Sequence, residues 1–105
     1  MAEYLYKLIP NRDGFINDVT KEEEAVLEEH FAYIENLLKT GELVLAGPCL
    51  DGSLGVVILR VDTYERAEEL MNGDPAVVNG IMQATLHPFR VSLMQGSKNG
   101  EEVVK

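Results

Sequence analysis

The sequence has little cysteine and few basic residues. Its single cysteine, Cys49, excludes an internal disulfide and fits a reducing cytoplasm. There is no Cys or His spacing typical of a structural zinc site. Nine basic residues against 18 acidic ones give a formal net charge of -9, without a cluster of Lys or Arg. Because such a chain is repelled by phosphate backbones and anionic lipid, nucleic-acid binding is not expected.

Long apolar runs are also lacking. Runs such as residues 56–59 are far shorter than the ~20 residues that a membrane span needs. The N-terminus contains an early acidic residue and has the pattern of a strand, not of a signal peptide. We therefore expect a cytoplasmic protein without membrane contact. A length of 105 residues fits one domain, predicted over 1–94 and followed by a polar tail at 95–105.

The first half of the chain predicts a strand, a loop and a long helix. Residues 3–9 are rich in aromatic and aliphatic side chains, which is typical of a strand. Residues 10–19 form a connection long enough to suggest a functional loop. Thr20 and Glu23 have the spacing of a capping box, and Gly41 is placed to end the helix in a left-handed conformation.

The second half predicts a hairpin, a helix and a last strand. Residues 42–50 and 55–61 are strand-like and are joined by a turn signal at 51–54. A second helix is expected from Asp62 or Thr63 to Asn72. The last strand is expected over roughly 82–94. Its apolar positions change parity at His87-Pro88, which predicts a bulge or bend.

The order β-α-β-β-α-β predicts an α+β protein with the ferredoxin-like βαββαβ fold, in which two helices cover one face of a four-stranded antiparallel sheet. Strands 43–46 and 56–59 are apolar on both faces, although a solvated face should alternate. We expect a second copy to cover the bare face, giving a homodimer through the sheet face, a dimeric α+β barrel. The alternative is that residues 10–19 or the tail fold over it.

His30 is the most informative single residue. At helical spacing it lies within the apolar arc formed by Val26, Tyr33 and Leu37. A core histidine satisfied by one hydrogen bond would give the same pattern. An inward imidazole also places a titratable group where a pocket would lie.

Asp74 stands directly before Pro75, just after the second helix. This pair is typical of a helix start, and capping a short helix over about 75–79 would alone explain Asp74. The fold also predicts antiparallel helices, which bring the end of the second helix near His30. A carboxylate beside an imidazole orients the ring for general-base chemistry, and one oxygen can cap while the other faces His30.

The remaining candidates carry weaker signals. Cys49 follows Gly47-Pro48 and is better explained as a small buried residue than as a nucleophile. His87 before Pro88 fits a bend. His30, His87 and Asp74 lack the spacing of a metal site, so no metal is expected. Gly47 and Pro48 allow close approach of a ligand to the backbone, as does an ordinary strand-end turn. Glu35 and Lys39 have the spacing of a surface ion pair.

The segments EEH, LAGPCLDG, NGDPAVVNGI and HPFRVSL, in this order, resemble the YCII-related domain family over residues 4–94. The resemblance implies a ferredoxin-like dimeric α+β barrel with an active-site His–Asp pair, here His30 and Asp74. Some members carry an Arg one turn before the His, where this sequence has Leu27. One relative is linked to dehydrochlorination of a chlorinated hydroxyquinol, a proton abstraction with elimination.

We hypothesise a small-molecule enzyme, lyase- or isomerase-like, with His30 as general acid/base and Asp74 as its orienting partner, and without a cofactor. The pocket is expected to be lined by Gly47, Pro48, Phe31 and Ile34 and to take an aromatic or acidic ligand. Two alternatives remain: a binding or interaction module without turnover, and a cofactor-free oxygenase acting on a hydroxylated aromatic.

Overall fold

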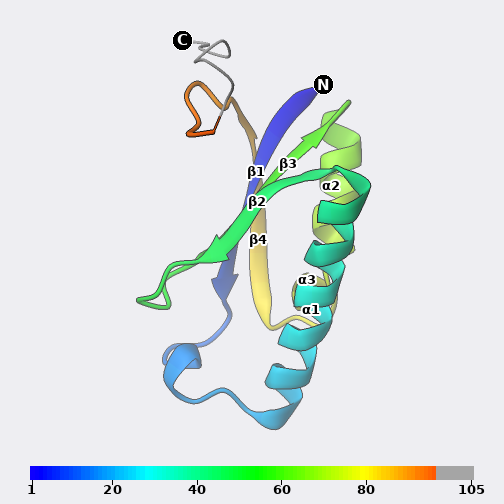
Figure 1. Cartoon of the computed structure of the whole chain (residues 1–105). Coiled ribbons are helices and arrows are strands. Elements are labelled where there is room, and N and C mark those ends of the chain that lie inside the picture. Colours follow the sequence, from blue (N-terminus) through cyan, green and yellow to red (C-terminus); the bar gives the residue numbers. More distant parts are fainter. Residues whose placement is uncertain (97–105) are drawn as a thin grey trace.

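Strand β1 (Ala2–Pro10) opens the chain and becomes a central strand of the sheet. A computed structural model, which describes residues 1–96, continues with η1 (Phe15–Asn17), α1 (Lys21–Thr40), β2 (Leu43–Pro48), β3 (Gly55–Val61), α2 (Tyr64–Asn72), α3 (Pro75–Val78) and β4 (Met82–Phe89). The strands pair antiparallel in the order β2-β3-β1-β4. The α-helices lie on one face of this sheet (Figure 1). The predicted α+β, ferredoxin-like βαββαβ fold is confirmed; most of the predicted tail, from residue 97 on, lies outside the described residues.

The ends of α1 follow the predicted local signals. The Thr20 hydroxyl accepts from the Glu23 amide at 3.1 Å, and the Glu23 carboxylate accepts from the Thr20 amide at 2.9 Å, which completes the capping box. Gly41 ends the helix with φ 87°, a left-handed conformation that glycine adopts without strain. These caps fix where α1 begins and ends, and His30 lies in the middle of the helix.

The core lies between the helices and the sheet. Tyr6 in β1 is opposite Val57 in β3 and Leu86 in β4, so these three side chains share the helix-covered face. Tyr6 and Leu59 are fully buried there. The other buried members of this cluster are Leu8, Ile34, Leu37, Leu43, Val57, Val61, Ala67, Leu70 and Met71.

The end of the last strand differs from the prediction. β4 ends at Phe89, and the ladder with β1 runs through His87 (opposite Leu5) and Pro88 (opposite Tyr4) without a change of register. Pro88 is tolerated because β4 is an edge strand, where a missing amide donor leaves no ladder partner unpaired. The strand stops because its last partner, Glu3, is almost at the start of β1. The predicted bulge and the extension to residue 94 were wrong.

The other face of the sheet carries no helix (Figure 1). Leu5 and Leu45 are both register neighbours of Ile58 and form an apolar row across three strands on this face. Leu45 is 47% exposed and Phe89 is 40% exposed. The connection from β1 to α1 runs below the end of the sheet instead of across this face (Figure 1). Within residues 1–96, no helix is long and apolar enough to cross a membrane.

Candidate functional site

Asp74 is positioned by the short turn between α2 and α3. Gly73 caps α2, and a Cβ added there would lie 2.9 Å from the Tyr33 hydroxyl and 3.3 Å from the Glu69 carbonyl oxygen, so a larger residue would require Tyr33 to shift. Asp74 then caps α3, where its Oδ1 accepts from the Ala76 amide at 2.9 Å, and Pro75 takes the first helical position. The capping role predicted for Asp74 is therefore present, and it holds the carboxylate in a fixed orientation.

His30 meets this carboxylate from α1. Its Nδ1 lies 2.7 Å from Asp74 Oδ1 and 2.9 Å from Oδ2. The Asp74 side chain is fully buried, whereas that of His30 is 22% exposed. Because an ionised carboxylate only accepts hydrogen bonds, Nδ1 is the donor, and the remaining ring nitrogen, Nε2, carries the free lone pair.

Tyr6 is a third member of this network, which the sequence analysis missed. Its hydroxyl, on the central strand β1, donates to Asp74 Oδ2 at 2.7 Å. Burial raises the pKa of Tyr6, and the charge of Asp74 and the hydrogen bond to it raise the pKa further, so the hydroxyl stays protonated. One signal could have found it: a tyrosine in the middle of a core strand needs a buried acceptor for its hydroxyl.

Asp74 thus receives donors from three segments: Tyr6 from β1, His30 from α1 and the Ala76 amide from α3. A carboxylate removed from water is costly unless its oxygens are satisfied in this way. No buried side-chain nitrogen or oxygen within residues 1–96 lacks a hydrogen-bond partner. The arrangement fixes both the position and the tautomer of the imidazole.

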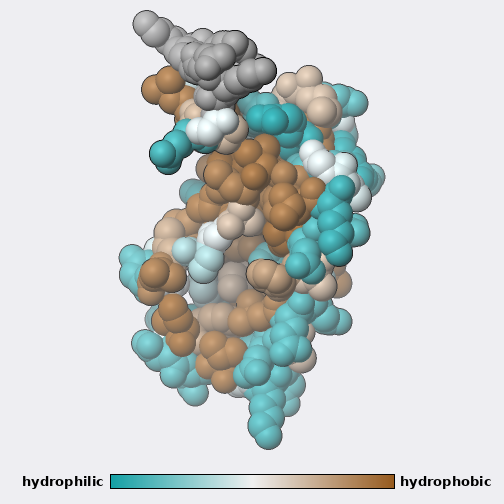
Figure 2. All heavy atoms as spheres, viewed as in Figure 1, coloured by the Kyte–Doolittle hydropathy of each residue, from teal (hydrophilic) through white to brown (hydrophobic). Residues whose placement is uncertain are grey.

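A cavity of about 720 Å³ lies beside His30. In Figure 2 a hollow with hydrophobic side chains around it opens on the side of β2, next to the hydrophilic outer surface of α1. The α1 side of the cavity consists of Leu27, His30, Phe31, Ile34, Glu35 and Leu38. The sheet contributes Leu8, Leu43, Ala46, Gly47, Pro48 and Val57.

The loop after β1 closes the end of the cavity. Phe15, Ile16 and Val19 line it from this loop. The loop is tied to α1 by Arg12, whose Nε donates to Glu23 at 3.0 Å, and it meets the β2–β3 turn where a Cβ on Gly52 would lie 2.7 Å from Ile16. The long connection singled out in the sequence therefore forms a wall of the cavity.

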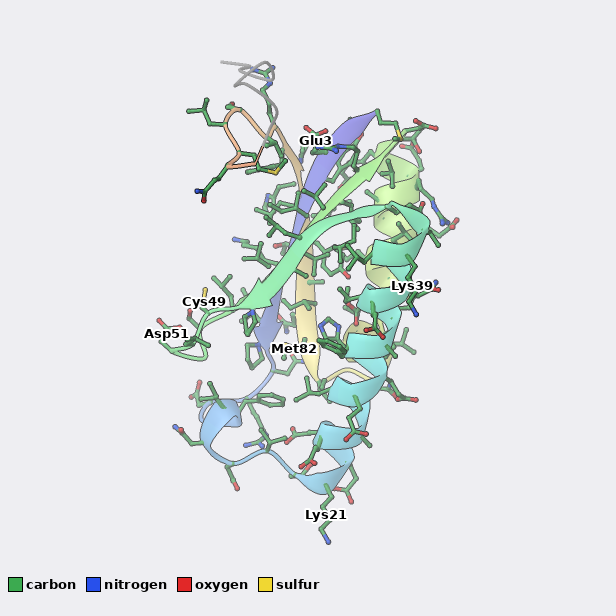
Figure 3. The ribbon with its side chains drawn as sticks, viewed as in Figure 1. Glu3, Lys21, Lys39, Cys49, Asp51 and Met82 are labelled. Atoms are coloured by element: carbon green, nitrogen blue, oxygen red, sulfur yellow. The ribbon has the colours of Figure 1, made fainter. Side chains whose placement is uncertain are left out.

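The structure brings most of the predicted site residues together. His30, Phe31, Ile34, Gly47 and Pro48 all line the cavity, whereas Asp74 lies behind His30 and does not line it. Met82, labelled in Figure 3, is the first residue of β4. Met82 also belongs to the cavity wall.

The YCII-related domain matches residues 6–90. The chain belongs to the YCII-related family. The uncharacterised protein YjpA of Bacillus subtilis (strain 168) is 26% identical over 62 residues, which cover 59% of this chain and 73% of YjpA.

Among solved structures, this YCII-related chain is similar to the 5-chloro-2-hydroxyhydroquinone dehydrochlorinase TftG from Burkholderia phenoliruptrix AC1100, in complex with 2,5-dihydroxybenzoquinone. The TM-score is 0.62 at 14% identity, and the match covers 83% of this chain and 93% of TftG. At this identity the similarity shows the fold.

The other candidate residues of this YCII-related chain do not contact the His30–Asp74 pair. His87 is exposed on the open face of the sheet, where its Nε2 lies 3.0 Å from Thr85 Oγ1. Cys49 lines the cavity as a free, half-buried thiol. Within the described chain, no group of three or more His, Cys, Asp or Glu side chains could hold a metal ion.

Proposed function

We propose that the cavity is an active site in which His30 is the general acid/base and Asp74 orients it, in a lyase- or isomerase-like reaction on a small hydroxylated aromatic or quinone-like molecule. One observation carries this proposal. A fully buried carboxylate holds Nδ1 of an imidazole whose ring lines a largely apolar cavity. Nε2 is then the nitrogen left for a ligand.

In the proposed reaction, the lone pair of Nε2 takes a proton from a C–H or O–H group of the ligand. The electron pair left on the ligand either expels a leaving group, such as chloride, or accepts the proton back at another atom. The resulting imidazolium is stabilised by the adjacent Asp74 carboxylate. Proton transfer by a positioned side chain contributes about 10²- to 10⁴-fold in rate. The similarity to TftG, which was solved with 2,5-dihydroxybenzoquinone, supports this ligand class.

The test is a screen of hydroxylated and chlorinated aromatics for binding, followed by assays of chloride release and of proton exchange with deuterated solvent. We expect His30→Gln to lower turnover about 10²- to 10⁴-fold while ligand binding is largely retained. His87→Gln, remote from the cavity, is the control and should be unchanged. A ligand that binds without turnover would favour the binding module, and oxygen consumption would favour the oxygenase.

We further propose a homodimer formed through the open sheet face. The apolar row of Leu5, Ile58 and Leu45 crosses this face, and no helix covers it. Ile58 is itself buried, whereas Leu45 and Phe89 on the same face are 47% and 40% exposed. Large exposed apolar patches are rare on monomers. Light scattering at micromolar concentration should give about twice the chain mass, since two protomers would associate. A monomeric mass would contradict this assembly.

A further inference from the structure

We propose that the cavity selects uncharged ligands over anionic ones, and that Glu35 is the residue that sets this preference. The inference rests on the proposed function in one respect: it requires that the cavity binds a small molecule. Within residues 1–96, neither a lysine nor an arginine lines the cavity, whereas Glu35 does. The ring of His30 is backed by the buried Asp74 carboxylate.

Glu35 belongs to the mouth of the cavity. It lies one helical turn from Phe31 and less than one turn from Leu38, and all three line the cavity. Phe31 is 68% exposed and Leu38 is 58% exposed, so this part of the wall faces the entrance. Along the axis of α1, Glu35 is about 7.5 Å from His30, at 1.5 Å per residue. Five residues at about 100° each also set the two side chains about 140° apart around α1, so Glu35 acts on a ligand in the cavity through its charge and not by contact with a group bound at Nε2.

The charge of Glu35 is not compensated by a salt bridge in the described chain. The surface pair predicted with Lys39 was wrong: no ion pair joins the two side chains. Lys39 lies on the side of α1 turned away from Cys49 and the β2–β3 turn (Figure 3). An exposed pair at this spacing gains little, and the exposed Glu35 side chain has no cationic partner in the described chain.

The arginine of the loop that closes the cavity is already paired. The Arg12 guanidinium lies 5.4 Å from the centre of the Phe15 ring, but it is paired with Glu23 and also donates to the Asp18 carbonyl. The first turn of α1 carries the Thr20 cap and three glutamates. The start of α3 is capped by Asp74. Among the lining residues within residues 1–96, an anionic ligand would thus meet Glu35 and no lysine or arginine, and the starts of α1 and α3 are already capped.

This distribution of charge suits a neutral, weakly acidic ligand such as a phenol better than a strongly acidic hydroxyquinone of the kind bound to TftG. In the form that acts as a base, the imidazole is neutral, so this form and the Asp74 carboxylate together carry one negative charge, which disfavours a second anion in an apolar cavity. When Nε2 accepts a proton from a hydroxyl or C–H group, the new imidazolium lies beside the new ligand anion. A neutral hydroxylated ring therefore gains an ion pair only during the reaction.

Two matched probes test the inference: 6-hydroxy-2-naphthoate and its methyl ester, which share the ring and differ in charge. Fluorescence titration at low salt should show the ester binding the parent protein about tenfold or more tighter than the acid. Glu35→Gln should reduce the ratio of ester affinity to acid affinity about three- to tenfold, because it improves binding of the acid alone. This size is expected for a carboxylate several ångströms away in a partly solvated site. Added salt should also reduce this affinity ratio in the parent protein, because salt screens the charge of Glu35.

Glu28→Gln is the control, because it removes the same charge from an exposed position of α1 outside the cavity lining. Glu28→Gln should leave the ratio of ester affinity to acid affinity unchanged. Leu27→Arg, which adds a cation to the cavity wall, should bring the acid to at least the affinity of the ester. Equal binding of acid and ester to the parent, or equal effects of Glu28→Gln and Glu35→Gln, would overturn the charge selection and leave the His30 chemistry untouched. Binding of neither probe would count against the cavity as a small-molecule site and so against both proposals.

Discussion

The layer between the helices and the sheet is packed under α2, whereas between α1, β2 and η1 it encloses a cavity. Under α2, Leu59 and Leu70 are 0% and 5% exposed. Around the cavity, Phe31, Leu38 and Ile16 are 68%, 58% and 50% exposed. Apolar side chains in the packed half are held by one another, and those in the hollow half have a free side. Stability and ligand contact thus depend on different halves of one layer.

The largest expected contrast is between a packed and a cavity-lining leucine. Leu59→Ala should lower the free energy of unfolding by about 2–5 kcal/mol, because it removes a fully buried side chain. Leu38→Ala should cost less than about 1 kcal/mol, since its side chain is mostly exposed. Urea unfolding of both variants measures the difference. Similar losses would mean that the cavity half is filled in solution.

Two tyrosine hydroxyls, that of Tyr6 buried and that of Tyr33 partly buried, give the next contrast. Tyr6 donates to the Asp74 carboxylate, and Tyr33 donates to the Leu70 carbonyl at 2.8 Å. Tyr6→Phe should cost about 1.5–3 kcal/mol, the range for a hydrogen bond to a charged group, and Tyr33→Phe about 0.5–1.5 kcal/mol. Each variant removes one tyrosine hydroxyl that donates a hydrogen bond, so the two substitutions are chemically the same. Equal costs by urea unfolding would indicate that Asp74 does not depend on Tyr6.

The smallest effect concerns the ion pair that ties the loop to α1. The hydrogen bond from Arg12 lowers the pKa of Glu23 to about 2, with help from the Thr20 amide. A depressed pKa gives stability that is present above the unfolded value, about 4.5, and is lost as the pH falls towards 2. Arg12→Gln should therefore lower the unfolding temperature slightly at pH 7, and the difference should fade between about pH 4.5 and 2.

Lys39→Gln is the control for that measurement, since it removes a cation with no ion pair in the described chain. A loss for Arg12→Gln that persists at pH 2 would assign the effect to packing of Arg12 on the Phe15 ring instead.

The features that were predictable from the sequence are those with local causes. The capping box at Thr20, the left-handed Gly41 and the Asp74-Pro75 helix start each involve residues within a few positions of one another. The meeting of His30 and Asp74 was also predictable, because the order of elements fixes how the two helices lie.

The features that were missed depend on distant or edge contacts. Tyr6 and Asp74 are separated by 68 positions, and nothing local marks them as partners. The cavity is the space left by several elements, and it cannot be read from any one of them. β4 was predicted too long because its end is set by the start of β1, its ladder partner. The Glu35–Lys39 pair was predicted from spacing, although exposed pairs gain too little to be reliable.

The three donors around Asp74 also bear on the order in which the chain folds. Tyr6 and His30 are 68 and 44 positions away from Asp74 in the chain. Until β1, α1 and the α2–α3 turn have all met, the carboxylate must keep its water, because partial burial would leave an anion unsatisfied. Contacts of such long range form slowly, so we expect the His30–Asp74 pair to form late in folding. In the native state, any opening that separates α3 from β1 must rehydrate Asp74, and the backbone amides at this turn should therefore exchange with solvent only slowly.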